Sequence, residues 1–323
     1  MIFPYLLRLL CLSFACFFLL NVALGLAVRV CSRVSTRLTA TMKARAAARV
    51  LLALRLLPGA LAVFVVASLC VPSYLWLEPD GTGERVGIVC ALLGLLGVAT
   101  CIGSLGRAGR ALATSVRFNR LCIRETRELN IAGKKICASV VETDAPLLAM
   151  GGLIRPRLII SREVLDTLSP AELDAALRHE NAHRLSLDNC KRFLVLLAPD
   201  ILPFVRGLRV LEETWAKLAE WAADDEAAAG DERRALSLAG ALVHVARMGA
   251  GPRLSFLHTS LVAGDQDFSA RVERLLRPEA ATPGGHSPIW PLLGLLFSAG
   301  LAAPLLWPSM LLSVHQLLEV FLR

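Results

Sequence analysis

The sequence predicts an α+β membrane protein, in which four transmembrane helices carry a mainly helical domain with a small β-sheet. Three observations lead to this class. Hydrophobic residues make up 55% of the chain and charged residues only 19%, against about 25% in a typical soluble domain. The apolar residues gather in four uncharged stretches, each long enough to cross a hydrocarbon core of about 30 Å. Between the third and fourth stretches, residues 107–287 show the helix and strand patterns of a folded domain.

Residues 1–106 hold three of the uncharged stretches, and residues 288–323 hold the fourth with a short C-terminus. The first stretch has an apolar part longer than the core of about 7–15 residues found in signal peptides, and only Arg8 precedes it. We therefore expect it to be retained as a span. The three N-terminal spans are expected at about 9–28, 56–77 and 86–105.

The charges that flank the spans predict the orientation of the chain. The segment between spans one and two is basic, the segment between spans two and three is acidic, and a second basic run follows span three. Because basic segments stay on the cytoplasmic side, we expect residues 107–287 in the cytoplasm of a multi-pass cell-membrane protein, with both termini outside. The basic residues of the first loop are Arg29, Arg33, Arg37, Lys43, Arg45 and Arg49.

The net charge of +8 does not indicate a nucleic-acid-binding protein. The basic residues border the spans, and neither interleaved aromatic residues nor a DNA-binding motif accompanies them, so we expect contacts with membrane lipid headgroups and no nucleic-acid partner. The nine cysteines form no C-x-x-C pair and most lie in or beside spans, where they serve as small apolar side chains.

Within residues 107–287 the chain is expected to leave the membrane as a helix up to about residue 127 and to turn at Gly133. β-Branched and apolar runs bounded by Gly and Pro predict three short strands. The apolar run with two prolines at 193–205 is too short to span, which favours an interfacial or re-entrant piece. The strands are expected at 136–142, at 146–150 and in a run that ends at Ile160; a further helix is expected at 212–229.

A helix at 169–185 is marked by its own start signal. Ser169 can cap the helix, Pro170 suits the first helical position, and Glu172 completes a capping box. Apolar residues then follow at helical spacing. The stretch "LRHENAHRL" lies inside this predicted helix.

The pattern H-E-x-x-H in that stretch predicts a metal site. Residues four apart on a helix lie one turn apart on the same face, so His179 and His183 present their imidazoles to one point. Two imidazoles at this spacing suit a tetrahedral Zn²⁺ ion, and Glu180 is placed to act as general base on a water molecule.

Zinc needs a third protein ligand, and Glu220 in "EWAADDEAA" is the best candidate. Asp224, one turn further, could orient a ligand imidazole through a hydrogen bond. Spacing alone leaves open whether Glu220 and Asp224 serve this site or belong to a solvated acidic face.

The segments "LSPAELDAALRHENAHRLSLD" and "EWAADDEAA" resemble the membrane-anchored gluzincin peptidases. The two similar branches are the BlaR/MecR-type antirepressors and the CAAX-prenyl-protease/HtpX-like peptidases. Both carry H-E-x-x-H, an aspartate five residues after the second histidine, and then E-x-x-x-D, which correspond here to Asp188, Glu220 and Asp224. The order of three spans, a cytoplasmic domain and a fourth span resembles the BlaR/MecR layout best.

The resemblance implies a zincin domain and a zinc metalloendopeptidase, a hydrolase in which Glu220 is the third ligand and Asp188 and Asp224 support the ligand histidines. It implies a protein or peptide substrate, with cleavage of a repressor-type partner in signal transduction as one role and quality control of membrane proteins as another. No S-x-x-K occurs in the chain, so we expect no penicillin-binding sensor domain.

Two departures from the family pattern, Asn181 and Arg184, favour a third hypothesis, a non-proteolytic transducer or scaffold that keeps the zinc fold. The intact Glu180 argues against it, because a scaffold needs no general base. In a peptidase, the strand at 146–150 could present an edge to an extended substrate, or it could be an ordinary paired strand.

Overall fold

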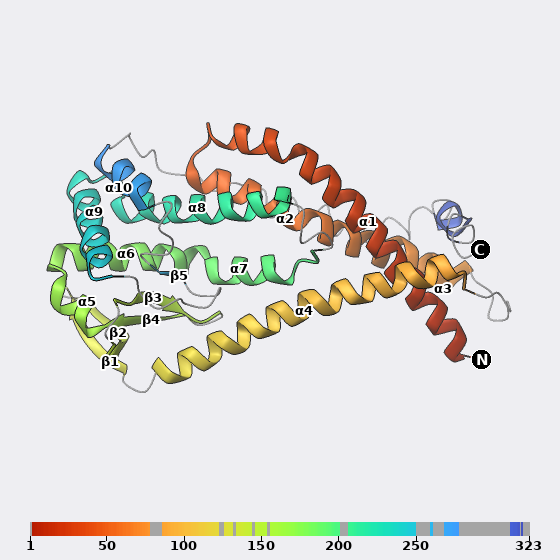
Figure 1. The fold of residues 1–323 in the computed structure, drawn as a ribbon, viewed down its shortest axis with the longest axis horizontal. Coiled ribbons are helices and arrows are strands. Elements are labelled where there is room, and N and C mark those ends of the chain that lie inside the picture. The colour runs from red at the N-terminus through yellow and green to blue at the C-terminus, as the bar shows by residue number, and fades with distance from the viewer. Residues whose placement is uncertain are drawn as a thin grey trace.

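Three long helical segments run along the molecule in the computed structural model, and one of them, α4 at Ile88–Cys122, extends from one end of the structure to the sheet at the other (Figure 1). Helix α1 covers Ile2–Thr39. Between α1 and α4, α2 at Ala44–Val65, the π-helical turn η1 at Val66–Cys70 and α3 at Val71–Leu77 follow one another without a break. The structure describes residues 2–77, 86–122, 126–131, 134–143, 146–153, 156–200, 206–249, 259–260, 268–277, 311–316 and 318.

All three N-terminal spans are confirmed as helices long and apolar enough to cross a membrane, but the helices extend well past the predicted stretches. Helix α1 has 38 residues, about 57 Å at 1.5 Å per residue, whereas a hydrocarbon core needs about 30 Å. The basic segment after the first span is therefore mostly helical, and only residues 40–43 separate α1 from α2. Most of the helix predicted after the third span is a continuation of α4.

The parts of the long helices that extend beyond the predicted spans pack against the domain that contains the sheet. The N-terminus of α1, helix α3 and the described C-terminal residues lie at one end of the structure, and the sheet lies at the other (Figure 1). Helix α8, Arg206–Ala228, packs along α1 and α2, and α7, Asp188–Leu197, packs against α4 and α2.

The predicted fourth span lies largely outside the described residues. Residues 311–316 and 318 are helical, and Ser73 of α3 donates a hydrogen bond to the carbonyl oxygen of Leu311 at 3.1 Å. Leu318 packs in a cluster with Leu12 and Tyr74, so this part of the chain contacts the first two spans.

The sheet has five strands in the order β1-β2-β4-β3-β5, with β2 and β4 parallel and the other neighbours antiparallel. The three predicted strands are confirmed as β2, β3 and β4. The prediction of helix up to residue 127 is wrong at its end, because α4 stops at Cys122 and β1 pairs with β2. The strands are Thr126–Ile131, Lys134–Val141, Leu148–Gly151, Arg157–Ser161 and Thr259–Ser260.

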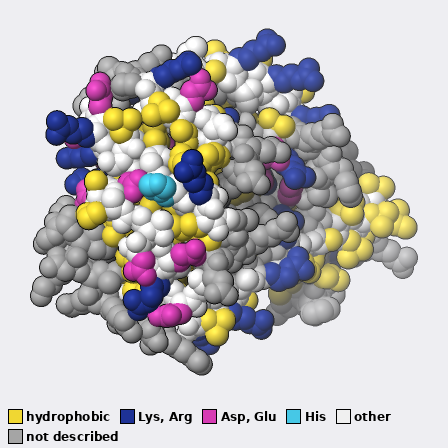
Figure 2. Space-filling model, turned by 60° about the vertical axis from the view of Figure 1, so that its left-hand side comes forward, with side chains coloured by type: hydrophobic (Ala, Val, Ile, Leu, Met, Phe, Trp, Pro, Cys, Tyr) yellow, Lys and Arg dark blue, Asp and Glu magenta, His cyan; other side chains and the backbone are white. Residues whose placement is uncertain are grey.

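Helices cover both faces of this sheet. Leu148, Leu158 and Ile160 pack with apolar residues of helices α6 and α9 in the main core, while Ala149 and Ile159 face the end of α4 through Cys122. Acidic and basic side chains are mixed on the molecular face that Figure 2 shows. The domain that contains the sheet also includes helices α5 at Arg162–Thr167, α6 at Pro170–Ser186, α9 at Glu232–Arg247 and α10 at Phe268–Leu276.

Helix α6 begins as predicted. The Ser169 hydroxyl accepts a hydrogen bond from the Glu172 amide, and the Glu172 carboxylate accepts one from the Ser169 amide at 2.9 Å. Caps of this kind stabilise a helix by about 1 kcal/mol. The capping box therefore fixes where the helix starts.

Candidate metal centre

Helix α6 buries the two histidines and the glutamate of the H-E-x-x-H motif. His179 and Glu180 are 0% exposed and His183 is 2% exposed, although the motif is polar. The two imidazole rings lie edge to face with their centroids 4.7 Å apart, as expected for residues one turn apart on one face. Polar groups at this depth need partners, because an unsatisfied buried polar group costs about 1–3 kcal/mol.

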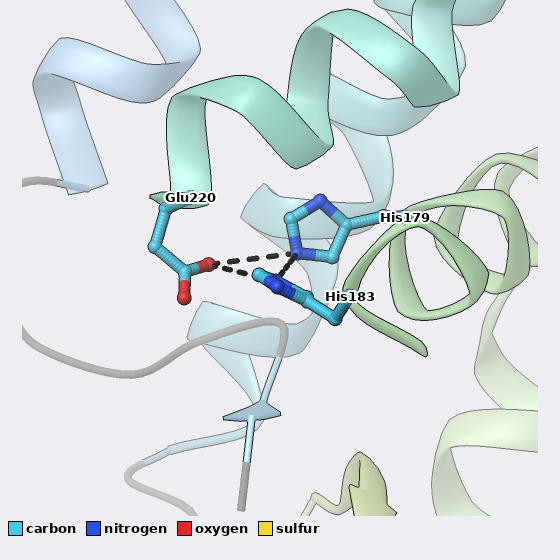
Figure 3. Close-up of side chains that lie close together, drawn as sticks. All are labelled: His179, His183 and Glu220. Carbon is cyan, nitrogen blue, oxygen red and sulfur yellow. Dashed lines mark hydrogen bonds and ion pairs between the residues drawn. The ribbon is translucent and has the colours of Figure 1, made fainter. Parts of the chain in front are cut away.

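Helix α8 brings Glu220 to the two histidines (Figure 3). Its Oε2 atom lies 3.5 Å from Nε2 of His179 and 3.5 Å from Nε2 of His183, and the two Nε2 atoms are 3.1 Å apart. Glu220 is 7% exposed, so it does not belong to a solvated acidic face. The structure thus brings together the three residues that the sequence analysis named as metal ligands.

The spacing of these atoms fits a small tetrahedral ion. Ligand atoms about 2.0–2.1 Å from a tetrahedral metal lie about 3.3 Å from one another. The three observed separations of 3.1, 3.5 and 3.5 Å bracket that value. His179, His183 and Glu220 could therefore hold a metal ion without rearrangement.

Two aspartates determine which nitrogen of each histidine faces the site. Nδ1 of His179 lies 2.9 Å from Oδ1 of Asp224, and Nδ1 of His183 lies 2.7 Å from Oδ2 of Asp188. A neutral imidazole that donates from Nδ1 has a lone pair on Nε2. When both imidazoles are neutral, two lone pairs and a carboxylate oxygen converge on one point, an arrangement that is repulsive unless a cation, either a metal ion or a proton, lies between them.

Asp188 reaches His183 because the chain turns sharply between α6 and α7. Leu187 has φ 56° and ψ 39°, the left-handed conformation that ends α6 and starts α7. A leucine in this conformation is strained by about 1 kcal/mol or more. The turn brings Asp188 back over the last turn of α6, where Lys191 also donates to its Oδ1 at 2.7 Å.

Two arginines that the sequence analysis missed complete the surroundings of Glu220 and Asp224. Arg271 of α10, 4% exposed, donates to both oxygens of Asp224 at 2.9 and 2.7 Å, and its Nη1 lies 3.4 Å from Glu220 Oε2. Arg192 of α7 lies 3.4 Å from Glu220 Oε1. No local motif marks either residue, and Arg271 is 47 positions from Asp224.

Charge and burial together shift the pKa values of the metal-free site. Burial opposes protonation of His183, but the carboxylates of Glu220 and Asp188 outweigh it and raise the pKa of His183 to about 10. For Glu220, burial favours the neutral acid, but His183, His179 and Arg271 hold its pKa well below the ordinary value. Glu220 is therefore ionised at neutral pH, as a metal ligand must be.

Glu180 differs from the other carboxylates of the site. Neither of its oxygens has a hydrogen-bond partner within the described part of the chain, and burial raises its pKa to about 7 against the opposing charges of His179 and His183. A carboxylate with a pKa near neutrality can both take and release a proton at the working pH of an enzyme.

The two departures from the family pattern stay outside the site. Asn181 and Arg184 lie on the exposed side of α6, where Arg184 Nε donates to Asn181 Oδ1 at 3.1 Å. The strand considered for substrate pairing is an ordinary paired strand, since Ala149 and Met150 pair with both β4 and β5. A cavity of about 10 Å³ beside His183 and Met150 has room for about one water molecule.

Comparison with known proteins does not identify the chain. No protein-family model matches the sequence. No curated protein matches it either. The geometry of the site is therefore the basis for assigning a function to the chain.

Proposed function

We propose that this chain is an integral-membrane zinc-dependent endopeptidase that hydrolyses peptide bonds in a cytoplasmic or membrane-proximal protein. The observation that carries the proposal is the convergence of His179, His183 and Glu220 beside a buried Glu180. Two imidazoles and a carboxylate are a ligand set of catalytic zinc sites, which leave one position open for water or substrate. A structural zinc site has four protein ligands and has no need of a neighbouring base.

Each residue then has a role. His179, His183 and Glu220 hold the zinc ion, which when bound polarises the scissile carbonyl group and lowers the pKa of a water molecule. Glu180 accepts the proton of the attacking water and returns it to the leaving amine. Asp224 and Asp188 keep the two ligand imidazoles in the tautomer with Nε2 free for the metal.

The proposed orientation places the metal centre in the cytoplasm and both termini outside. The long helices connect the membrane-crossing part to the metal centre, and the junction of α1 and α2, with the basic residues that flank it in both helices, lies on the metal-centre side. The substrate is consequently a protein that reaches the cytoplasmic surface of the membrane. A repressor-type partner and a damaged membrane protein both meet this condition.

The test compares the purified wild type with the Glu180→Gln variant, which keeps the size of the side chain and removes the base. Zinc content is measured by mass spectrometry of the metal, and cleavage is measured on β-casein and on the chain itself. We expect equal zinc content and a loss of cleavage of about 10²–10⁴-fold. Glu163→Gln, at an exposed position of α5, is the matched control and should cleave as the wild type does. Undiminished cleavage by Glu180→Gln contradicts the proposed role of Glu180.

A further inference from the structure

The turn that follows α7 lies among the three long helices. Helix α7 ends at Leu197 because Ala198 precedes Pro199, and a residue before proline disfavours the helical conformation. The turn Ala198–Pro199–Asp200 comes next, and one polar side chain from each long helix contacts it. This was the part of the chain for which the sequence favoured an interfacial or re-entrant piece.

The three contacts are specific to successive residues of the turn. Arg107 of α4 donates to the carbonyl oxygen of Ala198 at 3.3 Å, and Asn21 of α1 donates to that of Pro199 at 3.4 Å. Nη2 of Arg55, on α2, lies 3.8 Å from Oδ2 of Asp200. Asn21 and Arg55 are each 4% exposed. Burying a polar side chain in a membrane-crossing segment costs free energy, so such residues are rare and mark functional positions.

Close packing holds the turn in the same place. A Cβ atom at Gly59 of α2 would lie 2.9 Å from Cδ of Pro199. The absence of a side chain at Gly59 therefore allows α2 to pack closely against the turn. Arg55 also forms an ion pair with Glu212 of α8 at 2.5 Å. The long helices thereby hold both the end of α7 and the first part of α8.

The other end of α7 reaches the metal centre. Asp188, its first residue, hydrogen bonds His183, and Arg192 contacts Glu220. Asn189 fastens this end to the sheet by donating to the carbonyl oxygens of Met150 and Gly152 at 3.0 and 2.9 Å. Helix α7 has 10 residues, about 15 Å, and so joins the two sites as one short rigid element.

We propose that Asn21, Arg55 and Arg107 are positioning residues of the metal centre, which set the place of Asp188 and Arg192 through α7 and of Glu220 through α8. The proposal rests on the proposed metal site. None of these three side chains touches a metal ligand. They nevertheless affect the affinity of the site for a metal ion and the geometry of the metal ligands. A displacement of the long helices then changes the positions of His183 and Glu220.

The test uses the full-length chain in detergent micelles, with Co²⁺ as the probe because its visible absorption reports ligand geometry. Arg107→Gln and Asn21→Leu should each weaken Co²⁺ binding by about threefold to tenfold, less than the 10–100-fold expected for a residue in contact with a ligand. They should also change the intensity of the visible bands. Arg107→Lys, which can still donate to Ala198, should restore both properties. Arg110→Gln, one turn away and exposed, is the control and should bind as the wild type.

A second pair of variants tests α7 itself and keeps the proposal testable if a membrane-helix variant fails to fold. Leu194 is 46% exposed on α7, so Leu194→Ala and Leu194→Gly remove the same side chain, but only glycine softens the helix. We expect Leu194→Gly to bind Co²⁺ about threefold more weakly than Leu194→Ala, by the same transmitted effect.

The outcomes separate this proposal from the metal site on which it rests. If Arg107→Gln, Asn21→Leu and Leu194→Gly bind Co²⁺ with wild-type affinity and spectrum while Asp188→Asn is impaired, the positioning role is overturned and the metal site stands. If the wild type itself takes up no stoichiometric Co²⁺, the metal site fails and the positioning role fails with it.

Discussion

Oδ1 of Asp224 on α8 lies 2.9 Å from Nδ1 of His179 on α6, and Asp224 also accepts hydrogen bonds from Nε and Nη2 of Arg271 at 2.9 and 2.7 Å. Three helices that are separate in the sequence are thus joined by one buried carboxylate, which is 1% exposed. Since Glu220 lies one turn before Asp224, the contact that orients His179 also sets where the third ligand falls. The metal centre is therefore part of the packing of α6, α8 and α10.

Asp224→Asn should weaken zinc binding by about 10–100-fold, because the amide keeps the shape of the side chain but loses the charge that orients His179 and pairs with Arg271. Competition with a chelator measures the affinity. Asp225→Asn is the matched control, since Asp225 forms a partly exposed ion pair with Arg274 and should leave the affinity as it is. Equal affinities for the two variants would show that Asp224 has no role at the metal.

Arg271→Met should lower the free energy of unfolding of the metal-free chain by about 3–5 kcal/mol, because it leaves the carboxylates of Asp224 and Glu220 without their buried cation. Arg274→Met on the same helix removes a pair that is about one third exposed and should cost at most about 1 kcal/mol. Thermal unfolding of the two variants side by side checks the difference. Comparable unfolding temperatures would count against a buried role for Arg271.

The stabilisation that zinc gives should increase with pH between about 6 and 9. In the metal-free chain the pKa of His183 is raised to about 10, so its protonated form contributes stability that is fully present below the unfolded pKa of about 6.5 and is lost as pH rises toward 10. Zinc must displace that proton, which is easier at higher pH. The rise in unfolding temperature on adding zinc should thus be larger at pH 8 than at pH 6. A rise that is the same at both values would exclude proton displacement from the histidines.

Gly97→Ala should destabilise the packing of α1 on α4, because a Cβ atom at this position would overlap the carbonyl oxygen of Phe14. Backbone at such a contact cannot move as a side chain does, and overpacking of this kind costs about 1–3 kcal/mol. Gly106→Ala, on the same helix with no atom within 4 Å of the added carbon, should be neutral or stabilising. Unfolding in detergent provides the comparison, and equal effects at the two glycines would mean that α1 and α4 are not in close contact.

The parts of this fold that could be predicted from sequence are those with a local physical signal. Uncharged stretches gave the three spans, the capping box at Ser169 gave the start of α6, and the fixed spacing of H-E-x-x-H placed His179 and His183. Glu220 could not be separated from a solvated acidic face by spacing, and only its resemblance to a known motif favoured it. The structure decides its position by burial and distance.

The parts that could not be predicted depend on contacts between distant segments. Arg271 resembles any basic residue on an amphipathic helix, and only the packing of α10 on α8 and α9 turns it toward Asp224. Strand β1 was not predicted, since it follows α4 after three residues without a Gly or Pro to mark the change. The run at 193–205, which includes the turn at Pro199, was predicted to be an interfacial or re-entrant piece, but the contacts of the turn with Asn21, Arg55 and Arg107 were not foreseeable.

The central claim is that His179, His183 and Glu220 bind one zinc ion. X-ray absorption at the zinc edge on the purified chain tests it most directly, because it counts imidazole ligands and measures their distances. We expect one zinc per chain with two imidazole nitrogens and one carboxylate oxygen at about 2.0–2.2 Å, and one imidazole fewer in His183→Ala. A wild type without stoichiometric zinc, or a His183→Ala variant with an unchanged ligand shell, would contradict the claim.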